Sequence, residues 1–170
     1  MPRYSHDMEQ VADFGVPVSR GWHRFRIESQ GEQDSKNTPG AKSWVYHFVC
    51  QDEPEVGQMH IQYCSLQPHA LGGLKAIYKA CNYRPGREGH DPETINDCEI
   101  YGLIDWELFD PTTNRGTPAP ASLKEAPEGK QLRSRIAPWN FKSINEPLPA
   151  SRSTAAAVGS FTGPSEDVPL

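Results

Sequence analysis

The chain has 170 residues, a formal net charge of −5 and only 36% hydrophobic residues, with 16 prolines and 14 glycines. This length suits one compact domain with flanking tails. No apolar run approaches the ~18 residues that a membrane-spanning helix needs, and the first residues lack the apolar core of a signal peptide. We therefore expect a soluble, cytoplasmic protein and exclude a membrane-spanning or secreted one.

The first predicted strand spans residues 20–30, after a polar lead-in at residues 1–19 that could form a short helical turn around residues 7–14. Its residues alternate between two kinds of side chain, and a period of two places these on opposite faces of a strand. His23, Phe25 and Ile27 form an apolar face. The opposite face carries one aromatic ring and two guanidinium groups, from Trp22, Arg24 and Arg26.

A long polar loop, residues 31–42, separates this strand from a second one at residues 43–51. The loop is longer than a tight hairpin needs, which is typical of binding loops. Both faces of the second strand are apolar or aromatic, so the sequence leaves open which face meets solvent. One face carries Trp44, Tyr46, Phe48 and Cys50, and the other carries Val45, His47 and Val49. Tyr46 and Phe48 fit the core somewhat better than the surface.

The rest of the domain is expected to contain three more strands and one helix. We expect a third strand at residues 58–66 and an amphipathic helix at residues 68–82, because apolar residues there recur at three- and four-residue spacing. A fourth strand is expected at residues 98–109, with a bend or bulge at Gly102. After a long Pro-rich loop, a fifth strand follows at residues 130–141, interrupted near Pro138.

Three strands, a helix and two strands give a mainly β fold with one helix. This is the order of an OB-fold, a five-stranded, partly open barrel that binds oligonucleotides on its second and third strands. Small α+β sandwiches share the order. We assign residues 20–146 to this domain and residues 147–170, which are small, polar and Pro-rich, to a disordered linker with an acidic C-terminal tip.

Aromatic and basic residues gather on the predicted strands and the first loop. Aromatic rings stack on the bases of a single strand at about 1–3 kcal/mol per base, while Arg and Lys bind its phosphates. This pattern predicts a surface for single-stranded nucleic acid. The candidate residues are Trp22, Arg24, Arg26, Lys36, Lys42, Trp44, Tyr46, Tyr63, Arg133 and Arg135.

Charge is segregated along the chain, so an acidic protein can still present a basic groove. Residues 88–110 hold eight acids and no Lys or Arg, whereas residues 130–142 hold four bases and no acid. A further basic group lies at residues 75–87. We expect the acids to lie on the far surface, away from a bound strand, although ordinary solvated faces would give the same composition.

The chain ends in an acidic and apolar tip. Such a tip suits an apolar pocket with a basic rim on a partner protein, although acidic tails also serve solubility alone. The predicted partner-binding residues are Glu166, Asp167, Val168, Pro169 and Leu170.

The sequence does not favour an enzyme, a cofactor or a metal site. Asp105 and Glu107 would share a strand face and could hold Mg²⁺, but no Lys follows two residues after either acid, as in many nucleases. No nucleophile triad, P-loop or G-x-G-x-x-G is present. The four cysteines form no C-x-x-C pair, so we interpret them as ordinary buried thiols.

Residues 20–27, 36–49, 57–66 and 71–82 resemble phage-encoded OB-fold single-stranded DNA-binding proteins. The tip at residues 165–170 is similar to the acidic tail ending of bacterial and phage single-stranded DNA-binding proteins, which usually ends in Phe rather than in Leu. The resemblance implies binding of single-stranded DNA without sequence preference, in phage DNA replication or recombination within an infected bacterial host, without catalysis or cofactor.

The resemblance also implies that the tip recruits replication or repair proteins. The alternative is an OB-like protein-interaction module that inhibits or recruits a host protein and does not bind nucleic acid.

Overall fold

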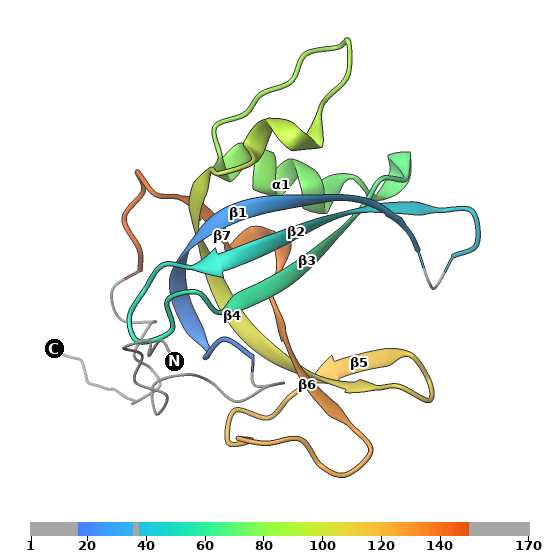
Figure 1. Cartoon of the computed structure of the whole chain (residues 1–170), viewed down its shortest axis with the longest axis vertical. Coiled ribbons are helices and arrows are strands. Elements are labelled where there is room, and N and C mark those ends of the chain that lie inside the picture. Colours follow the sequence, from blue (N-terminus) through green and yellow to red (C-terminus); the bar gives the residue numbers. More distant parts are fainter. Residues whose placement is uncertain (1–16, 36–37, 150–170) are drawn as a thin grey trace, which may run out of the picture.

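The computed structural model describes residues 17–35 and 38–149 (Figure 1). This part of the chain is mainly β and contains one α-helix and seven strands. The elements in chain order are β1 (Gly21–Asp34), β2 (Lys42–Cys50), β3 (Met59–Ser65), the short 3-10 helix η2 (Pro68–Ala70), α1 (Gly72–Ala80), η3 (Pro92–Ile95), β4 (Glu99–Asp110), β5 (Arg115–Pro118), β6 (Gln131–Arg135), η4 (Pro138–Asn140) and β7 (Phe141–Ser143).

The strands form one open antiparallel sheet in the order β3-β2-β1-β4-β5, with β6 and β7 also paired to β4. The long strand β4 joins the two halves of this sheet. Its first half lies between β1 and β7, and its second half lies between β5 and β6. The sheet curves strongly, so that β3 and β6 approach each other across the fold (Figure 1).

Strand β1 bends at a β-bulge. Its pairing with β2 shifts register between Ser29 and Gly31, and Gly31 has a φ of +114°, a conformation that glycine adopts readily. The bulge allows β1 to continue to Asp34, further than the predicted end at residue 30. The loop to β2 is correspondingly shorter than predicted.

Helix α1 packs against β3 and β7 and covers one end of the curved sheet (Figure 1). Leu74, Ile77, Tyr78 and Ala80 are its buried face, which agrees with the predicted periodicity. The chain leaves the helical conformation at Asn82, whose φ of +59° is left-handed. This matches a helix that ends at an Asn shortly before a proline.

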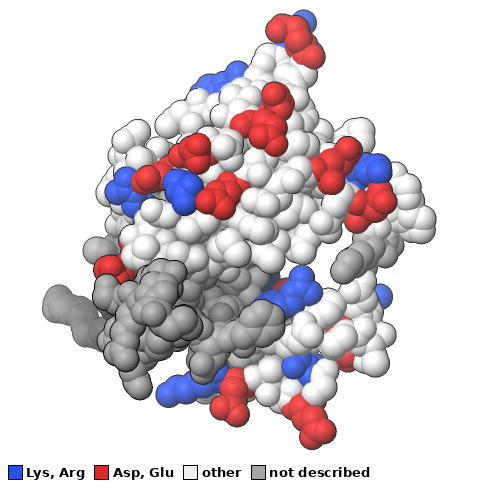
Figure 2. All heavy atoms as spheres, in the orientation of Figure 1, with Lys and Arg blue, Asp and Glu red and all other residues white. Residues whose placement is uncertain are grey.

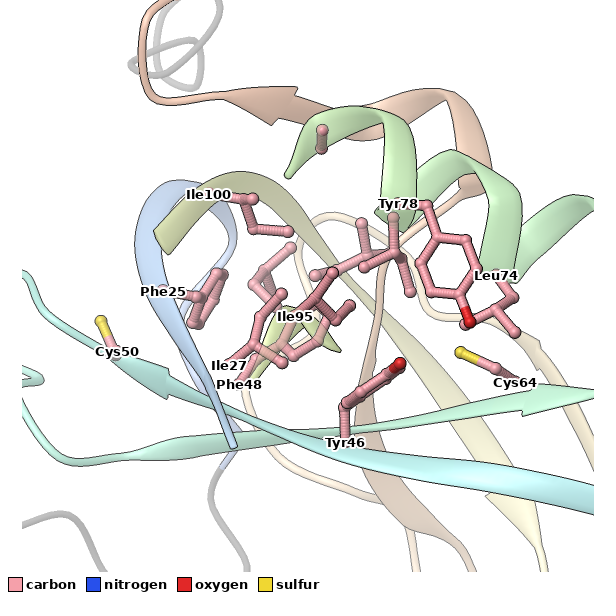
Figure 3. Packing of buried hydrophobic residues seen from close by; sticks show 14 of the residues in the cluster. Phe25, Ile27, Tyr46, Phe48, Cys50, Cys64, Leu74, Tyr78, Ile95 and Ile100 are labelled. Atoms are coloured by element: carbon pink, nitrogen blue, oxygen red, sulfur yellow. The ribbon is translucent and has the colours of Figure 1, made fainter. Parts of the chain in front are cut away.

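The core lies between the curved sheet and α1. Phe25, Ile27, Phe48 and Ile100 are fully buried, and their side chains point toward those of the helix (Figure 3). The alternation predicted for the first strand is therefore confirmed, because Phe25 and Ile27 lie on its inner face. Phe48 and Tyr46 show that the inner face of β2 carries the even-numbered side chains.

Gly102 serves close packing rather than a bulge. It pairs with His23 on one side and Phe141 on the other without a register shift. A Cβ at this position would lie 2.8 Å from Cδ1 of Ile136 and 3.3 Å from the Phe25 ring. Of the predicted bend or bulge, the bulge is therefore wrong. The missing side chain instead leaves room for Ile136 and Phe25 to pack against the backbone.

The predicted fifth strand is divided, as Pro138 suggested. Strand β6 ends at Arg135, η4 begins at Pro138, and β7 resumes the pairing with β4 at Phe141. The short strand β5 was not predicted. It is formed by exposed, polar residues that carry no hydrophobic alternation, so the sequence held no signal for it.

Candidate nucleic-acid interface

The outer face of β1 is polar, as predicted, but its arginines are paired with carboxylates. Nη2 of Arg24 lies 2.5 Å from Oε1 of Glu99. Arg26 contacts Glu28 at 3.0 Å and Asp97 at 3.5 Å. These guanidinium groups are therefore already neutralised by neighbouring carboxylates, which weakens their use as phosphate ligands.

The position of the acids corrects the expectation that they lie away from the basic face. Antiparallel pairing places Arg26 opposite Glu99 at the start of β4, and outward-facing residues of adjacent strands share one surface. Asp97 and Glu99 thus lie beside the arginines that the sequence offered for phosphates. Figure 2 shows Lys and Arg side chains interspersed with Asp and Glu rather than gathered into one basic field.

Neither predicted tryptophan is a free stacking platform. Trp22 is half-buried, and its Nε1 is buried without a hydrogen-bond partner among the described residues. Trp44 is half-buried against the core, and its Nε1 donates to Oγ of Ser29 at 2.8 Å. Trp22 shares the polar face of β1 with Arg24 and Arg26, but much of it is covered.

Tyr46 cannot contact a ligand. Its side chain is fully buried, and its hydroxyl donates to the carbonyl oxygen of Pro92 at 2.7 Å. Burial also raises the pKa of this phenol far above its ordinary value. Its prediction as a stacking residue is therefore wrong. Tyr46 belongs to the inner face of β2, together with Phe48 and Cys50.

Of the two predicted basic loop residues, the structure describes Lys42. Lys42 lies opposite Asp34 at the base of the β1–β2 loop, and its Nζ lies 2.5 Å from that carboxylate. This hydrogen bond raises the pKa of Lys42. Lys36 lies outside the described residues, as do residues 165–170 of the predicted partner-binding tip.

Tyr63 is exposed, as the stacking prediction requires. About half of it is accessible to solvent (49%), and Met59 and Ile61 on the same strand are similarly exposed at 47% and 45%. All three point outward from β3, because His60 and Cys64 between them point into the core. They form an apolar stripe along the outer face of an edge strand.

The sequence reasoning did not select Met59 and Ile61, because hydrophobicity alone assigns such residues to a core. The signal that could have found them is the strand's parity. His60 and Cys64 share one face of β3. This face suits the interior, because a cysteine is commonly buried and both nitrogens of the His60 ring can form hydrogen bonds there. His60 is indeed buried, with Nδ1 2.7 Å from Oγ of Ser134 and Nε2 2.8 Å from Oε1 of Gln62.

Arg133 and Arg135 lie beside this stripe. Because His60 and Ser134 meet inside, alternation directs Met59, Ile61 and both arginines to the outer surface. The Arg133 guanidinium lies over the Phe109 ring at 4.1 Å from its centroid. Strand pairing places Glu107 opposite Arg133 and Asp105 opposite Arg135. Within residues 17–35 and 38–149, however, neither arginine forms an ion pair, and Asp105 pairs with Arg20 instead. We call this surface the β3–β6 surface, and it comprises Met59, Ile61, Tyr63, Arg133 and Arg135.

A second basic region lies at α1, where an apolar pocket of about 420 Å³ opens between the helix and the segment after it. Leu71, Leu74 and the rings of Tyr78 and Tyr83 line it. Its basic lining residues are Lys75, Lys79 and Arg84, and in the described part of the chain no carboxylate pairs with them.

No protein-family model matches the chain, and no curated protein has a significantly similar sequence. The described residues contain no helix with the length and apolar character needed to cross a membrane. The function must therefore be argued from the geometry of these surfaces.

Proposed function

We propose that the protein binds single-stranded DNA without sequence preference, using an OB-fold barrel. The proposed barrel consists of β1, β2, β3, β4 and β6, with α1 inserted between the third and fourth of these strands. The chain order and the approach of β3 to β6 support this assignment. OB-folds bind oligonucleotides on the face that β2 and β3 form.

The observation that carries the proposal is the β3–β6 surface. It combines one exposed aromatic ring, two exposed aliphatic side chains and two arginines without carboxylate partners among the described residues. Bases would stack on Tyr63 and contact Met59 and Ile61, while phosphates would bind Arg133 and Arg135. His47, which is paired with Ile61 in register and is half-buried, extends the same face toward β1.

This site differs from the sequence prediction in its centre. The predicted centre was the outer face of β1, whose arginines are paired with carboxylates. The proposed centre is β3, with Tyr63, Arg133 and Arg135 retained from the predicted set and Tyr46 removed. Replication or recombination of phage DNA remains the process in which we propose that the protein acts.

The test is a fluorescence-anisotropy titration of labelled oligo-dT at several salt concentrations. Affinity should fall steeply with salt, with a log–log slope of about −0.7 for each phosphate contacted. Tyr63→Ala should weaken binding by roughly 5- to 150-fold, which corresponds to about 1–3 kcal/mol for one stacked base.

The matched control is Trp139→Ala. Trp139 is even more exposed than Tyr63 (77%) but lies on η4, so its removal should leave affinity unchanged. Absent or salt-independent binding by the full chain would refute the proposal, as would equal losses in the two variants.

A protein-interaction module is the second candidate, and the α1 pocket is the observation that favours it. An apolar pocket with three cations that pair with no carboxylate of the described residues suits an acidic peptide that carries an apolar side chain. This candidate predicts no affinity for oligo-dT. It also predicts a protein partner whose capture is lost in the Lys75→Glu, Lys79→Glu double variant and retained in Tyr63→Ala.

A further inference from the structure

Three potential metal ligands meet where β1 begins and β2 ends. Nδ1 of His23 lies 3.8 Å from Sγ of Cys50 and 3.7 Å from Oδ2 of Asp52. The donor atoms of all three residues lie within 4.8 Å of one another. The cluster could not be predicted from sequence spacing, because His23 is distant from Cys50 and Asp52 along the chain and belongs to a different strand.

Backbone hydrogen bonds hold the three residues in place. Strand pairing sets Cys50 opposite Phe25, next to His23. The amide of Gln51 donates to the carbonyl oxygen of Arg24 at 2.8 Å, and the amide of Arg24 donates to Oδ2 of Asp52 at 2.8 Å. The carboxylate is thereby oriented by the strand that carries the imidazole.

The hydrogen bond that Nε2 of His23 makes determines which ring nitrogen can bind a cation. Nε2 lies 2.8 Å from the carbonyl oxygen of Ser19, which can only accept a hydrogen bond. Nε2 therefore carries a proton, and Nδ1 is the ring nitrogen that lies beside Cys50 and Asp52. Histidines that bind metals commonly donate their other N–H to a carbonyl or carboxylate in this way.

We propose that His23, Cys50 and Asp52 form a binding site for a divalent zinc-type cation, with a water molecule as the fourth ligand. Zinc binds Cys sulfur at about 2.3 Å and His nitrogen or carboxylate oxygen at about 2.0–2.2 Å. In a tetrahedron these bonds separate the ligand atoms by about 3.3–3.7 Å. The Nδ1–Sγ and Nδ1–Oδ2 distances, 3.8 and 3.7 Å, lie close to the upper end of this range, so a small side-chain movement brings the atoms to bonding positions.

Charge and access also suit a divalent cation. One thiolate and one carboxylate balance two positive charges, and the Cys50 proton is released to solvent when the cation binds. Cys50 is fully buried, whereas 43% of the Asp52 side chain is accessible, so the cation enters past Asp52. The bound cation would tie the start of β1 to the turn that follows β2.

This inference does not depend on the proposed function, because the cluster is not part of the β3–β6 surface. The test uses the full chain, stripped of metal by a chelator and titrated with Co²⁺ alone. A 1:1 complex with a thiolate-to-cobalt charge-transfer band should form, and Zn²⁺ should displace it.

Cys50→Ser should abolish the charge-transfer band, whereas the matched control Cys64→Ser, which also removes a buried thiol, should keep it. Asp52→Asn changes an accessible side chain and should weaken Co²⁺ binding about tenfold or more without unfolding the protein. Absence of the band in the unmodified protein would overturn the inference. So would a band that persists in Cys50→Ser, or Co²⁺ affinity that is unchanged in a folded Asp52→Asn variant.

Discussion

The four cysteines occupy four different environments, although the sequence presented them as equivalent. All are free thiols, and Cys50 and Cys64 are buried. Burial raises the pKa of Cys64 to about 12 and also raises that of Cys50. Cys98 is half-buried, and a hydrogen bond from the Cys81 thiol lowers its pKa. The thiolate is the reactive form, so Cys98 should be the most reactive of the four.

We predict that iodoacetamide at mildly alkaline pH modifies Cys98 before Cys64 or Cys50, with the order read by peptide mass spectrometry over time. Cys81→Ala should slow the modification of Cys98, because the hydrogen bond that stabilises its thiolate is removed. Cys64→Ala serves as the control and should leave the rate at Cys98 unchanged. Equal modification rates at Cys98 and Cys64 in the folded protein would contradict the prediction.

At the scale of the elements, Gly102 allows β4 to pass close beneath core side chains. We predict that Gly102→Ala lowers the free energy of unfolding by about 1–3 kcal/mol, the usual cost of overpacking a core. The added Cβ would meet Ile136 and Phe25. Urea denaturation followed by circular dichroism measures this change.

Gly73→Ala in α1 is the matched control for this substitution. A Cβ there meets no atom within 4 Å, and alanine favours a helix over glycine by about 0.5–1 kcal/mol. The control should therefore be neutral or stabilising. If the Gly102→Ala protein were as stable as the control, the prediction would be contradicted, because the core would then have rearranged around the added methyl group without loss of unfolding free energy.

The buried contact between His60 of β3 and Ser134 of β6 leads to a second prediction at this scale, which concerns the pH dependence of stability. Burial lowers the pKa of His60 to about 4, whereas an unfolded histidine has a pKa of about 6.5. Between these values the unfolded chain binds a proton that the folded chain does not, so stability falls as pH falls from about 6.5 to 4. The loss from this group should reach roughly 3 kcal/mol.

Urea unfolding at pH 7 and at pH 4.5 measures the loss of stability, and the His60→Gln variant is compared with the unmodified protein. Glutamine cannot take up a proton in this range, so the variant should be less stable at pH 7 but lose less stability on acidification. An unchanged pH dependence in the variant would assign the acid sensitivity to other groups.

Strand parity explains which parts of the fold were predictable. Residues 20–28 separate apolar from polar side chains, so the inner position of Phe25 and Ile27 followed from the sequence. Both faces of β2 are apolar, and Tyr46 and Val45 are both buried. Only the strand pairing, which sets Val45 opposite the outward-facing Tyr63, shows that Tyr46 faces the core and Val45 the other side. Helix α1 was predictable for the same reason as the first strand, because its apolar positions have one period.

The candidate surface was less predictable, because it depends on pairings between distant segments. Which carboxylate neutralises which arginine is decided by the register of β1 against β4, more than 70 residues apart for Arg24 and Glu99. Likewise, the contact between His60 of β3 and Ser134 of β6 exists only because the sheet curves. No local pattern in the sequence encodes either relation.

At the scale of the whole molecule, the decisive property is how charges are paired rather than the net charge of −5. The acids at the start of β4 hold the arginines of β1 in ion pairs that are partly exposed, and such pairs contribute little to stability. These ion pairs nevertheless neutralise the arginines, so β1 would attract a strand of DNA that crosses from β3 to β1 only weakly.

We therefore predict that the Asp97→Asn, Glu99→Gln double variant binds oligo-dT more tightly than the unmodified protein. The double variant frees Arg24, which should add about one phosphate contact and steepen the log–log salt slope by about 0.7. Arg26 loses Asp97 but keeps Glu28 at 3.0 Å, so its contribution should be smaller. Anisotropy titrations across salt concentrations measure both quantities. Unfolding free energy should change by less than about 1 kcal/mol for each exposed pair that is removed.

The control is Glu88→Gln with Glu146→Gln, which removes the same two negative charges from positions outside the β1 and β4 pairs. If affinity responds only to net charge, the two double variants should gain equally. If ion pairing on β1 restricts the site, only the Asp97→Asn, Glu99→Gln protein should gain a steeper salt slope. Equal slopes would place the path of the DNA entirely on the β3–β6 surface, away from β1.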